Sequence, residues 1–331
     1  MINLKGRNLL TLLDFSTREI EYLLDLSRDL KRAKYAGNEQ ENLKGKNIVI
    51  LFQKTSTRTR CAFEVAALDQ GAHVTYIGAE GSQMGIKESI ADTARVLGRM
   101  YDAIEFRCMK QSDCDELAKY AGVPVYNGLS ELYHPTQMIA DYMTMREKFG
   151  QDLKGIKVVF FGDARNNVAN SLMICGAKLG VHFVACGPKK LWPNETIINK
   201  CKEIAKETGA KLEFVEDPLT AAKGAHVIYT DIWVSMGEPK EVWEERIKLL
   251  KPYQVNKKLF EVADKEAIFM HCLPSYHDLN TNIGKEIHEK FGLKEMEVTN
   301  DVFESKRSWV FEEAENRLHS IKAIMVATIG K

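Results

Sequence analysis

The chain has 331 residues, of which 45% are apolar, enough for two ordinary domains with a hydrophobic core in each. Its 46 basic and 46 acidic side chains balance, which excludes a net positive field that would attract nucleic acid or anionic membranes. The sequence has neither a secretory signal pattern at its start nor an apolar run of membrane-spanning length, so we expect a soluble, cytoplasmic protein.

Strand-like and helix-like segments alternate through the first half of the chain. Ser16 and Glu19 have the spacing of a capping box, which predicts a helix from there to about residue 37. Strands are predicted at 46–52, 73–78, 102–107 and 123–128. Helices are predicted at 55–71, 86–100, 112–122 and from residue 134 onward.

The second half repeats this alternation, with strands predicted at 157–163, 182–187, 211–217, 225–231 and 267–272. Residues 148–155 are the predicted hinge between the halves, and residues 309–330 are predicted to form a last helix. Because such alternation requires crossover connections, the predicted fold class is α/β, with two domains that are each a mainly parallel sheet with helices on both faces. We expect interdomain helices to join the two domains.

The motif STRTR lies where such a sheet binds ligands, beyond the carboxyl end of a strand. It follows a predicted strand directly and opens a helix, whose unpaired N–H groups and dipole attract a phosphate. Ser56, Thr57 and Thr59 add hydroxyl donors, and Arg58 adds a planar guanidinium that binds oxygens bidentately. An ordinary capped helix with solvated arginines is the alternative interpretation of this motif.

Polar residues follow two further predicted strands of the first half. Arg107 ends one strand, where a solvated arginine is the common explanation. In HPTQ, Pro135 suits the first position of a helix, so His134 and Gln137 would point the same way. A histidine at that place is more often a cap or a surface residue, so neither motif identifies a site by itself.

The second half offers polar groups that suit an amino acid. GDARNN follows a strand and opens a helix, but it lacks the glycine fingerprint of dinucleotide-binding proteins. Asn167 is suited to holding a small zwitterion, and the choice between Asn166 and Asn167 stays open. Asp231 ends a predicted strand, where it could be an ordinary helix cap or could bind an ammonium group. Ser235 and Met236 lie in the loop that follows.

The motif MHCLP ends the last predicted strand and contains Cys272 and Leu273. A buried structural cysteine is the usual explanation for such a residue. His271, Cys272 and His277 do not have the spacing of a zinc site, so we expect no metal.

Taken together, STRTR, HPTQ, DIWVSMGE and HCLP resemble the aspartate/ornithine carbamoyltransferase family over nearly the whole chain. The first two motifs point to carbamoyl phosphate and the last two to ornithine. The resemblance implies transfer of the carbamoyl group from carbamoyl phosphate to the side-chain amine of L-ornithine, which gives L-citrulline and phosphate in arginine metabolism. It implies no cofactor.

The resemblance also implies a domain organisation and an assembly. Residues 1–147, with a C-terminal helix at about 313–331 that packs back on them, would bind carbamoyl phosphate. Residues 148–312 would bind ornithine. The family forms homotrimers, or assemblies of trimers, with active sites between neighbouring subunits, so Gln83 would reach into a neighbouring site.

Each substrate has a set of candidate residues implied by the resemblance. The carbamoyl phosphate set is Ser56, Thr57, Arg58, Thr59, Gln83, Arg107, His134, Gln137, Cys272, Leu273 and Arg317. The ornithine set is Asn167, Asp231, Ser235 and Met236. Arg58, Arg107 and His134 are the candidate catalytic donors to the carbonyl oxygen, and Asp231 and Cys272 the candidates that orient the amino groups.

Other functions compete with this interpretation. The acceptor could be putrescine, N-acetylornithine or aspartate, although aspartate calls for cationic groups where this chain has Asp231. A dinucleotide-dependent oxidoreductase would need the missing glycine fingerprint. A non-catalytic phosphate-binding protein would leave the polar groups at so many strand ends unexplained.

Overall fold

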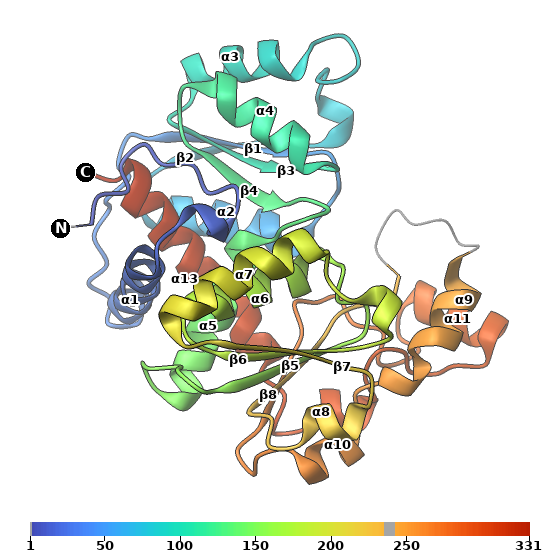
Figure 1. The fold of residues 1–331 in the computed structure, drawn as a ribbon. Helices are drawn as coiled ribbons and strands as arrows, with labels where there is room; N and C mark the ends of the chain where they lie inside the picture. The colour runs from blue at the N-terminus through green and yellow to red at the C-terminus, as the bar shows by residue number, and fades with distance from the viewer. Residues whose placement is uncertain (1, 235–241) are drawn as a thin grey trace. The chain divides into compact units, whose positions relative to one another are not determined.

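The computed structural model describes residues 2–234 and 242–331 (Figure 1). The chain divides into two compact units, one made of residues 1–147 and 314–331 and the other of residues 148–313. Which substrate each unit binds stays a prediction at this stage.

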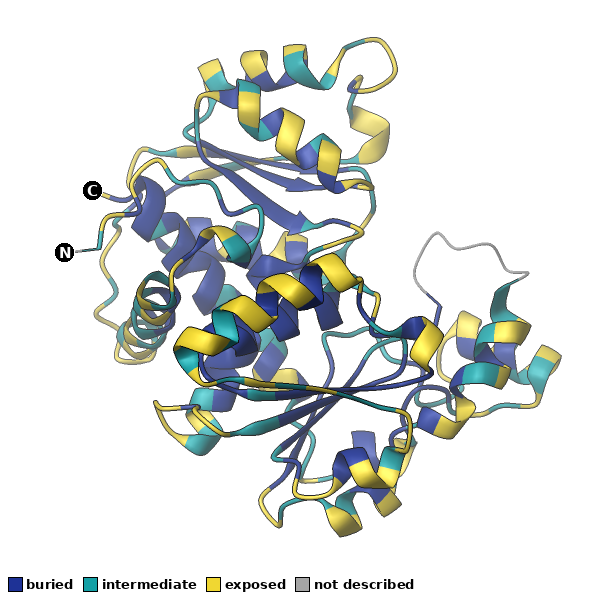
Figure 2. Cartoon of the chain, viewed as in Figure 1, coloured by how far each residue is buried: buried dark blue, intermediate teal, exposed yellow. Residues whose placement is uncertain are grey.

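The sheet of the first unit has four strands in the order β2-β1-β3-β4, all paired in parallel. The strands are β1 (Asn47–Phe52), β2 (His73–Ile77), β3 (Ala103–Arg107) and β4 (Val125–Leu129). Strands β1 and β3 are almost wholly buried, because helices cover both faces of the sheet (Figure 2). The predicted parallel α/β arrangement is confirmed.

Within the described residues, six α-helices accompany this sheet, and two of them extend into the second unit. They are α1 (Thr17–Tyr35), α2 (Thr57–Asp69), α3 (Ile90–Met100), α4 (Gln111–Ala121), α5 (Pro135–Phe149) and α13 (Val310–Ile329). The capping box predicted at the start of α1 is present, with Ser16 and Glu19 as its two members. Helices α5 and α13 are therefore the interdomain helices that the sequence predicts.

The two faces of the first sheet have different characters. Helices α3 and α4 pack on the face that carries the apolar side chains of Ile104 and Phe106. On the opposite face, the ring of Tyr126 on β4 stacks on Phe63 of α2, and its hydroxyl bonds Thr328 of α13. Since side chains alternate along a strand, the polar residues of β3 point to this second face.

The second unit has five parallel strands in the order β7-β6-β5-β8-β9. They are β5 (Lys157–Phe161), β6 (His182–Cys186), β7 (Lys211–Val215), β8 (Val227–Thr230) and β9 (Ile268–Met270). The helices are α6 (Asn167–Lys178), α7 (Glu195–Thr208), α8 (Pro218–Ala222), α9 (Trp243–Leu250), α10 (Lys257–Val262), α11 (Asn282–Phe291) and α12 (Asn300–Phe303). Single-turn 3-10 helices lie at Leu12–Asp14, Ala79–Gly81, Lys189–Leu191 and Lys251–Tyr253.

Strands β5, β8 and β9 lie side by side in this order, and the loops that carry the second unit's candidate residues follow them. Strand β8 ends at Thr230 and β9 at Met270, so Asp231 and Cys272 lie just beyond carboxyl ends, where parallel sheets bind ligands. None of the helices described here combines the length and the apolar character needed to span a membrane.

Candidate functional site

The start of α2 forms an anion site in the first unit. Ser56 is the N-cap, and its Oγ accepts the Thr59 N–H at 3.3 Å. No acidic residue lies in the first turn, so the positive end of the helix dipole is not cancelled locally. Thr57 and Arg58 are the first two helical residues, and Arg58 is only partly buried. This geometry suits a phosphate group.

Basic side chains from three other elements gather around this helix start. Arg317 of α13 is buried and donates from Nη2 to the Oγ1 of Thr59 at 3.1 Å. Arg107, at the end of β3, and His134, just before α5, are also buried. Burial holds the pKa of His134 well below its usual range, and the positive charges of Arg317, Arg107 and Arg58 lower it further. The imidazole is therefore neutral at pH 7 and can donate a hydrogen bond without adding charge.

A buried acid, Glu105, lies near the arginines. It is on β3, two residues before Arg107, and its side chain is fully buried. Burial raises the pKa of Glu105 well above its usual range, although Arg107 and Arg317 act in the opposite direction. The side chain occupies the space over Gly128 of β4, where an added Cβ would lie 1.8 Å from Glu105 Oε1. The sequence interpretation missed this residue.

Gln137 lies one turn into α5 and is fully buried. Its amide donates to Asp141 Oδ1 at 2.8 Å, which fixes the orientation of the side chain. Gln83 is exposed, in a turn where its carbonyl accepts the N–H groups of Ile86, Lys87 and Glu88. Its placement in a neighbouring subunit's site stays a prediction.

The second arginine of STRTR makes contacts within the fold. Arg60 pairs with Glu64 at 2.9 Å, one turn along α2, and its guanidinium lies 3.9 Å from the ring centroid of Tyr76. Arg60 is exposed, and its guanidinium interacts with side chains of this chain, Glu64 and Tyr76.

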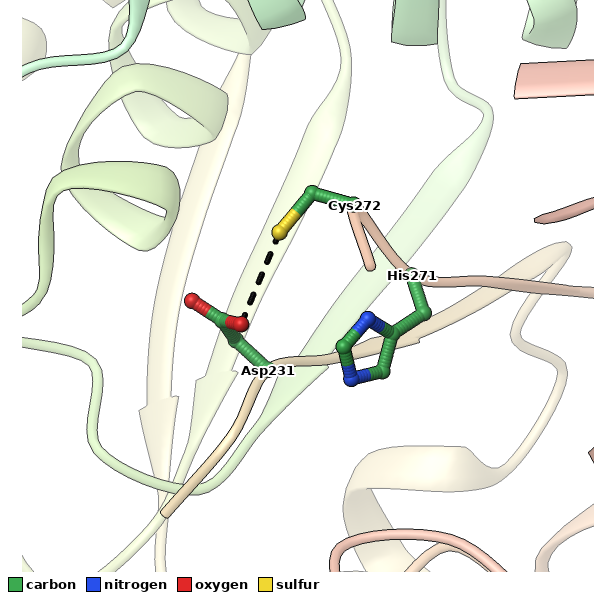
Figure 3. A group of neighbouring side chains, drawn as sticks. All are labelled: Asp231, His271 and Cys272. Atoms are coloured by element: carbon green, nitrogen blue, oxygen red, sulfur yellow. Dashed lines mark hydrogen bonds between the residues drawn. The ribbon is translucent and has the colours of Figure 1, made fainter. Parts of the chain in front are cut away.

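In the second unit, a cluster forms around Asp231 (Figure 3). Cys272 Sγ donates to Asp231 Oδ1 at 3.5 Å, and the Ile232 N–H donates to the same oxygen at 2.8 Å. Asn166 Nδ2 donates to Oδ2 at 3.2 Å. Burial raises the pKa of Asp231, and His271, the Ile232 N–H and the Cys272 thiol act against the rise. The carboxylate is thus oriented by three donors, as a group that holds an ammonium would be.

Of the two adjacent asparagines, Asn166 is the one that donates to Asp231. It is also the N-cap of α6, and its Oδ1 accepts the Ala169 N–H at 2.8 Å. Asn167 follows as the first residue of the helix, and its role toward ornithine stays a prediction. The candidates Ser235 and Met236 lie outside the described residues.

Asp231, His271 and Cys272 offer an oxygen, a nitrogen and a sulfur within 4.8 Å of one another. Such donors suit a metal ion in principle. However, His271 Nδ1 already accepts the Leu273 N–H at 2.9 Å, so that nitrogen's lone pair is in use. The absence of a metal therefore stays our prediction for this cluster.

Comparison with known proteins identifies the family. Residues 7–147 match the model described as aspartate/ornithine carbamoyltransferase, carbamoyl-P binding domain. Residues 154–328 match the model described as aspartate/ornithine carbamoyltransferase, Asp/Orn binding domain. The chain belongs to the aspartate/ornithine carbamoyltransferase family.

Individual members of this family are similar along their whole length. A catabolic ornithine carbamoyltransferase from Mycoplasma capricolum subsp. capripneumoniae is 68% identical over 94% of this chain and 99% of its own. One from Treponema denticola is 63% identical over 99% of this chain and 96% of its own. The solved structure of the Pyrococcus furiosus ornithine carbamoyltransferase is 44% identical, covers 99% of both chains and gives a TM-score of 0.90.

Sequence reasoning about this carbamoyltransferase family member missed Glu105, considered His271 only as a possible metal ligand, and left Asn166 open as the alternative to Asn167. Asn166 contacts Asp231, Glu105 lies near the arginines, and His271 contacts Leu273. The sequence contains one signal for Glu105, since a lone acid in an apolar strand needs a nearby compensating group. It contains none for the other two, whose contacts depend on how separate loops meet.

Proposed function

We propose that this chain transfers a carbamoyl group between carbamoyl phosphate and the side-chain amine of L-ornithine, with L-citrulline and phosphate as the other pair. The observation that carries this is the gathering of Arg58, Arg107, Arg317 and His134 at the start of α2. Arg58, Arg107 and His134 lie within the residues that match the carbamoyl-P binding domain. Relatives at 63% and 68% identity carry the name ornithine carbamoyltransferase, which supports ornithine as the acceptor.

On the carbamoyl phosphate side, the helix N–H groups and Arg58 would hold the phosphate. Attack on the carbamoyl carbon puts negative charge on its oxygen, and fixed donors aimed at that oxygen are the expected main source of catalysis. Arg58, Arg107 and neutral His134 are the proposed donors. The burial of Arg107 and His134 favours this role, since donors in a dry site act more strongly than donors in water.

On the ornithine side, Asp231, Cys272 and the asparagines of GDARNN would hold the amino acid. The attacking amine must lose a proton first, and with a pKa near 10.4 this costs roughly 4 to 5 kcal/mol at pH 7. Asp231 and Cys272 would orient the amine while its proton leaves, and the departing phosphate can accept that proton. Cys272 is not needed as a nucleophile, because the amine itself attacks.

The experiment for this function is a product assay with carbamoyl phosphate and four acceptors: L-ornithine, N-acetylornithine, putrescine and L-aspartate. We expect citrulline from ornithine and little product from the others, because putrescine lacks the carboxylate and α-amine that the asparagines and Asp231 would hold. Product from another amine and none from ornithine would change the acceptor. No carbamoylated product from any amine would refute carbamoyl transfer itself.

For the physiological direction, we propose citrulline breakdown, since both of these relatives are named catabolic. One active site catalyses both directions, so the direction depends on which substrates the cell supplies. Deleting the gene from its own organism should make citrulline accumulate. Accumulation of ornithine instead would indicate the synthetic direction.

We further propose a cytoplasmic homotrimer in which Gln83 completes a neighbouring site. All seven cysteines are free thiols, as is usual in a reducing compartment. Sedimentation should give three times the chain mass of 37.5 kDa. Gln83→Ala and His134→Ala proteins, each weak alone, should regain activity when mixed and reassembled, because some sites then receive both intact residues. No gain on mixing would place Gln83 in its own subunit's site or in none.

A further inference from the structure

The turn that carries Cys272 and Leu273 has an unusual backbone. Leu273 has φ 59°, and among the described residues it is the one non-glycine residue with positive φ. This left-handed conformation crowds the Cβ of any L-amino acid and persists only where surrounding contacts impose it. The contacts that impose it therefore matter for the position of Cys272, whose thiol bonds Asp231.

One such contact comes from His271. The N–H of Leu273 donates to His271 Nδ1 at 2.9 Å, which closes a compact turn over three residues. An imidazole nitrogen that accepts a hydrogen bond carries no proton, so the ring proton is on Nε2. That nitrogen lies 3.3 Å from Oε1 of Glu297, and both side chains are completely buried.

The surroundings of His271 hold both its ring and its main chain. Glu297 Oε1 accepts the Ser275 hydroxyl at 2.8 Å and the Tyr276 N–H at 2.7 Å, so it cannot swing away from the ring without releasing the segment after the turn. The main-chain N–H of His271 donates to buried Glu313 at 2.9 Å. The acceptor nitrogen is thus presented to Leu273 in a fixed position.

We propose that His271 is a positioning residue for the reaction, because its Nδ1 holds Leu273 in the left-handed conformation that places Cys272 against Asp231. This inference rests on the proposed carbamoyl transfer. In this proposal the positioning role belongs to His271 Nδ1, and Glu297 acts only by orienting the imidazole ring. A merely structural role would reside in the buried contact between Nε2 and Glu297.

Two substitutions separate the two nitrogens. In His271→Asn, the side-chain oxygen takes the place of Nδ1 and can accept the N–H two residues on, as in an Asx-turn, but nothing reaches Glu297. In His271→Gln, the amide can take the place of Nε2, but the acceptor for Leu273 is lost. Both variants lose the packing of the imidazole ring. A difference in activity between them therefore reports which of the two ring nitrogens is needed.

The measurements are kcat and KM for ornithine, with thermal melting to record the folded state. We expect His271→Asn to keep kcat/KM within about tenfold of wild type and His271→Gln to lose about 100-fold or more, the usual scale for a misplaced catalytic group. Equal losses, or the reverse order, would overturn the proposal. Wild-type citrulline formation in the same assay tests the proposed function separately.

A second experiment, with His271→Gln combined with Leu273→Gly, covers the case in which His271→Gln alone does not fold. Glycine adopts positive φ without strain, so Leu273→Gly should reduce the need for the Nδ1 contact. The activity ratio of His271→Gln to its parent should therefore be higher in the Leu273→Gly background than in wild type. An unchanged ratio, or loss of folding in both backgrounds, would assign His271 to the core alone and contradict the proposal.

Discussion

The contact between Thr59 and Arg317 gives the sharpest prediction about the anion site. Thr59→Val keeps the shape of a fully buried side chain but removes the oxygen that accepts from Arg317 at 3.1 Å. The Thr59 N–H stays capped by Ser56, so the helix start is retained. A hydrogen bond to a charged group is worth roughly 1.5 to 3 kcal/mol, which at about 1.4 kcal/mol per factor of ten raises KM for carbamoyl phosphate roughly 10- to 150-fold.

The assay for Thr59→Val is the initial rate of citrulline formation at saturating ornithine, with carbamoyl phosphate varied. Thr59→Ser keeps the hydroxyl and is the matched control, expected to stay close to wild type. If Thr59 acts through Arg317, the valine substitution should add little once Arg317→Lys is present. A wild-type KM in a well-folded Thr59→Val protein would refute the reasoning.

Three further predictions concern Glu105, Cys272 and Arg60. Because burial raises the pKa of Glu105, the unfolded chain loses its proton first as pH rises above the ordinary value of 4.5, and folding stability falls. Glu105→Gln should therefore raise the melting temperature more at pH 8 than at pH 5, and an equal effect at both would contradict this. Cys272→Ala removes the donor to Asp231 and should lower kcat/KM for ornithine roughly fivefold, on the order of 1 kcal/mol, without abolishing carbamoyl phosphate binding in calorimetry. Unchanged kinetics would refute a role for Cys272. Arg60→Ala should lower the melting temperature slightly and leave KM for carbamoyl phosphate unchanged, since its charge is used on Glu64 and Tyr76; a raised KM would place Arg60 in the anion site.

Local signals were sufficient to predict the strands of both sheets and the helices of the first unit, but not the helices α9 to α12. The capping box at Ser16, the helix start at Ser56 and the apolar runs of the strands each depend on residues close in sequence. The strict alternation of strands and helices then predicted a parallel sheet, because each strand must connect to the next through a crossover helix. The predicted last strand runs past the observed one, since β9 ends at Met270 and the turn at Leu273 leaves the ladder.

The candidate site was only partly predictable, for a physical reason. The rule that ligands bind at carboxyl strand ends identified Arg107 and Asp231 without any knowledge of their neighbours. Contacts such as Arg317 with Thr59, or Asn166 with Asp231, join residues 258 and 65 positions apart. No periodicity encodes such contacts, so the resemblance supplied Arg317 and left the two asparagines undecided.

The electrostatics of the first unit bear on the order in which substrates bind. Arg58, Arg107 and Arg317 act together on His134, and holding like charges in a buried place costs free energy. Glu105 does not relieve this cost in full, because burial favours its protonated, neutral form. A phosphate dianion at the start of α2 would add negative charge beside these arginines and so lower that cost. Carbamoyl phosphate in one direction, and phosphate in the other, is thus expected to bind before the amino acid.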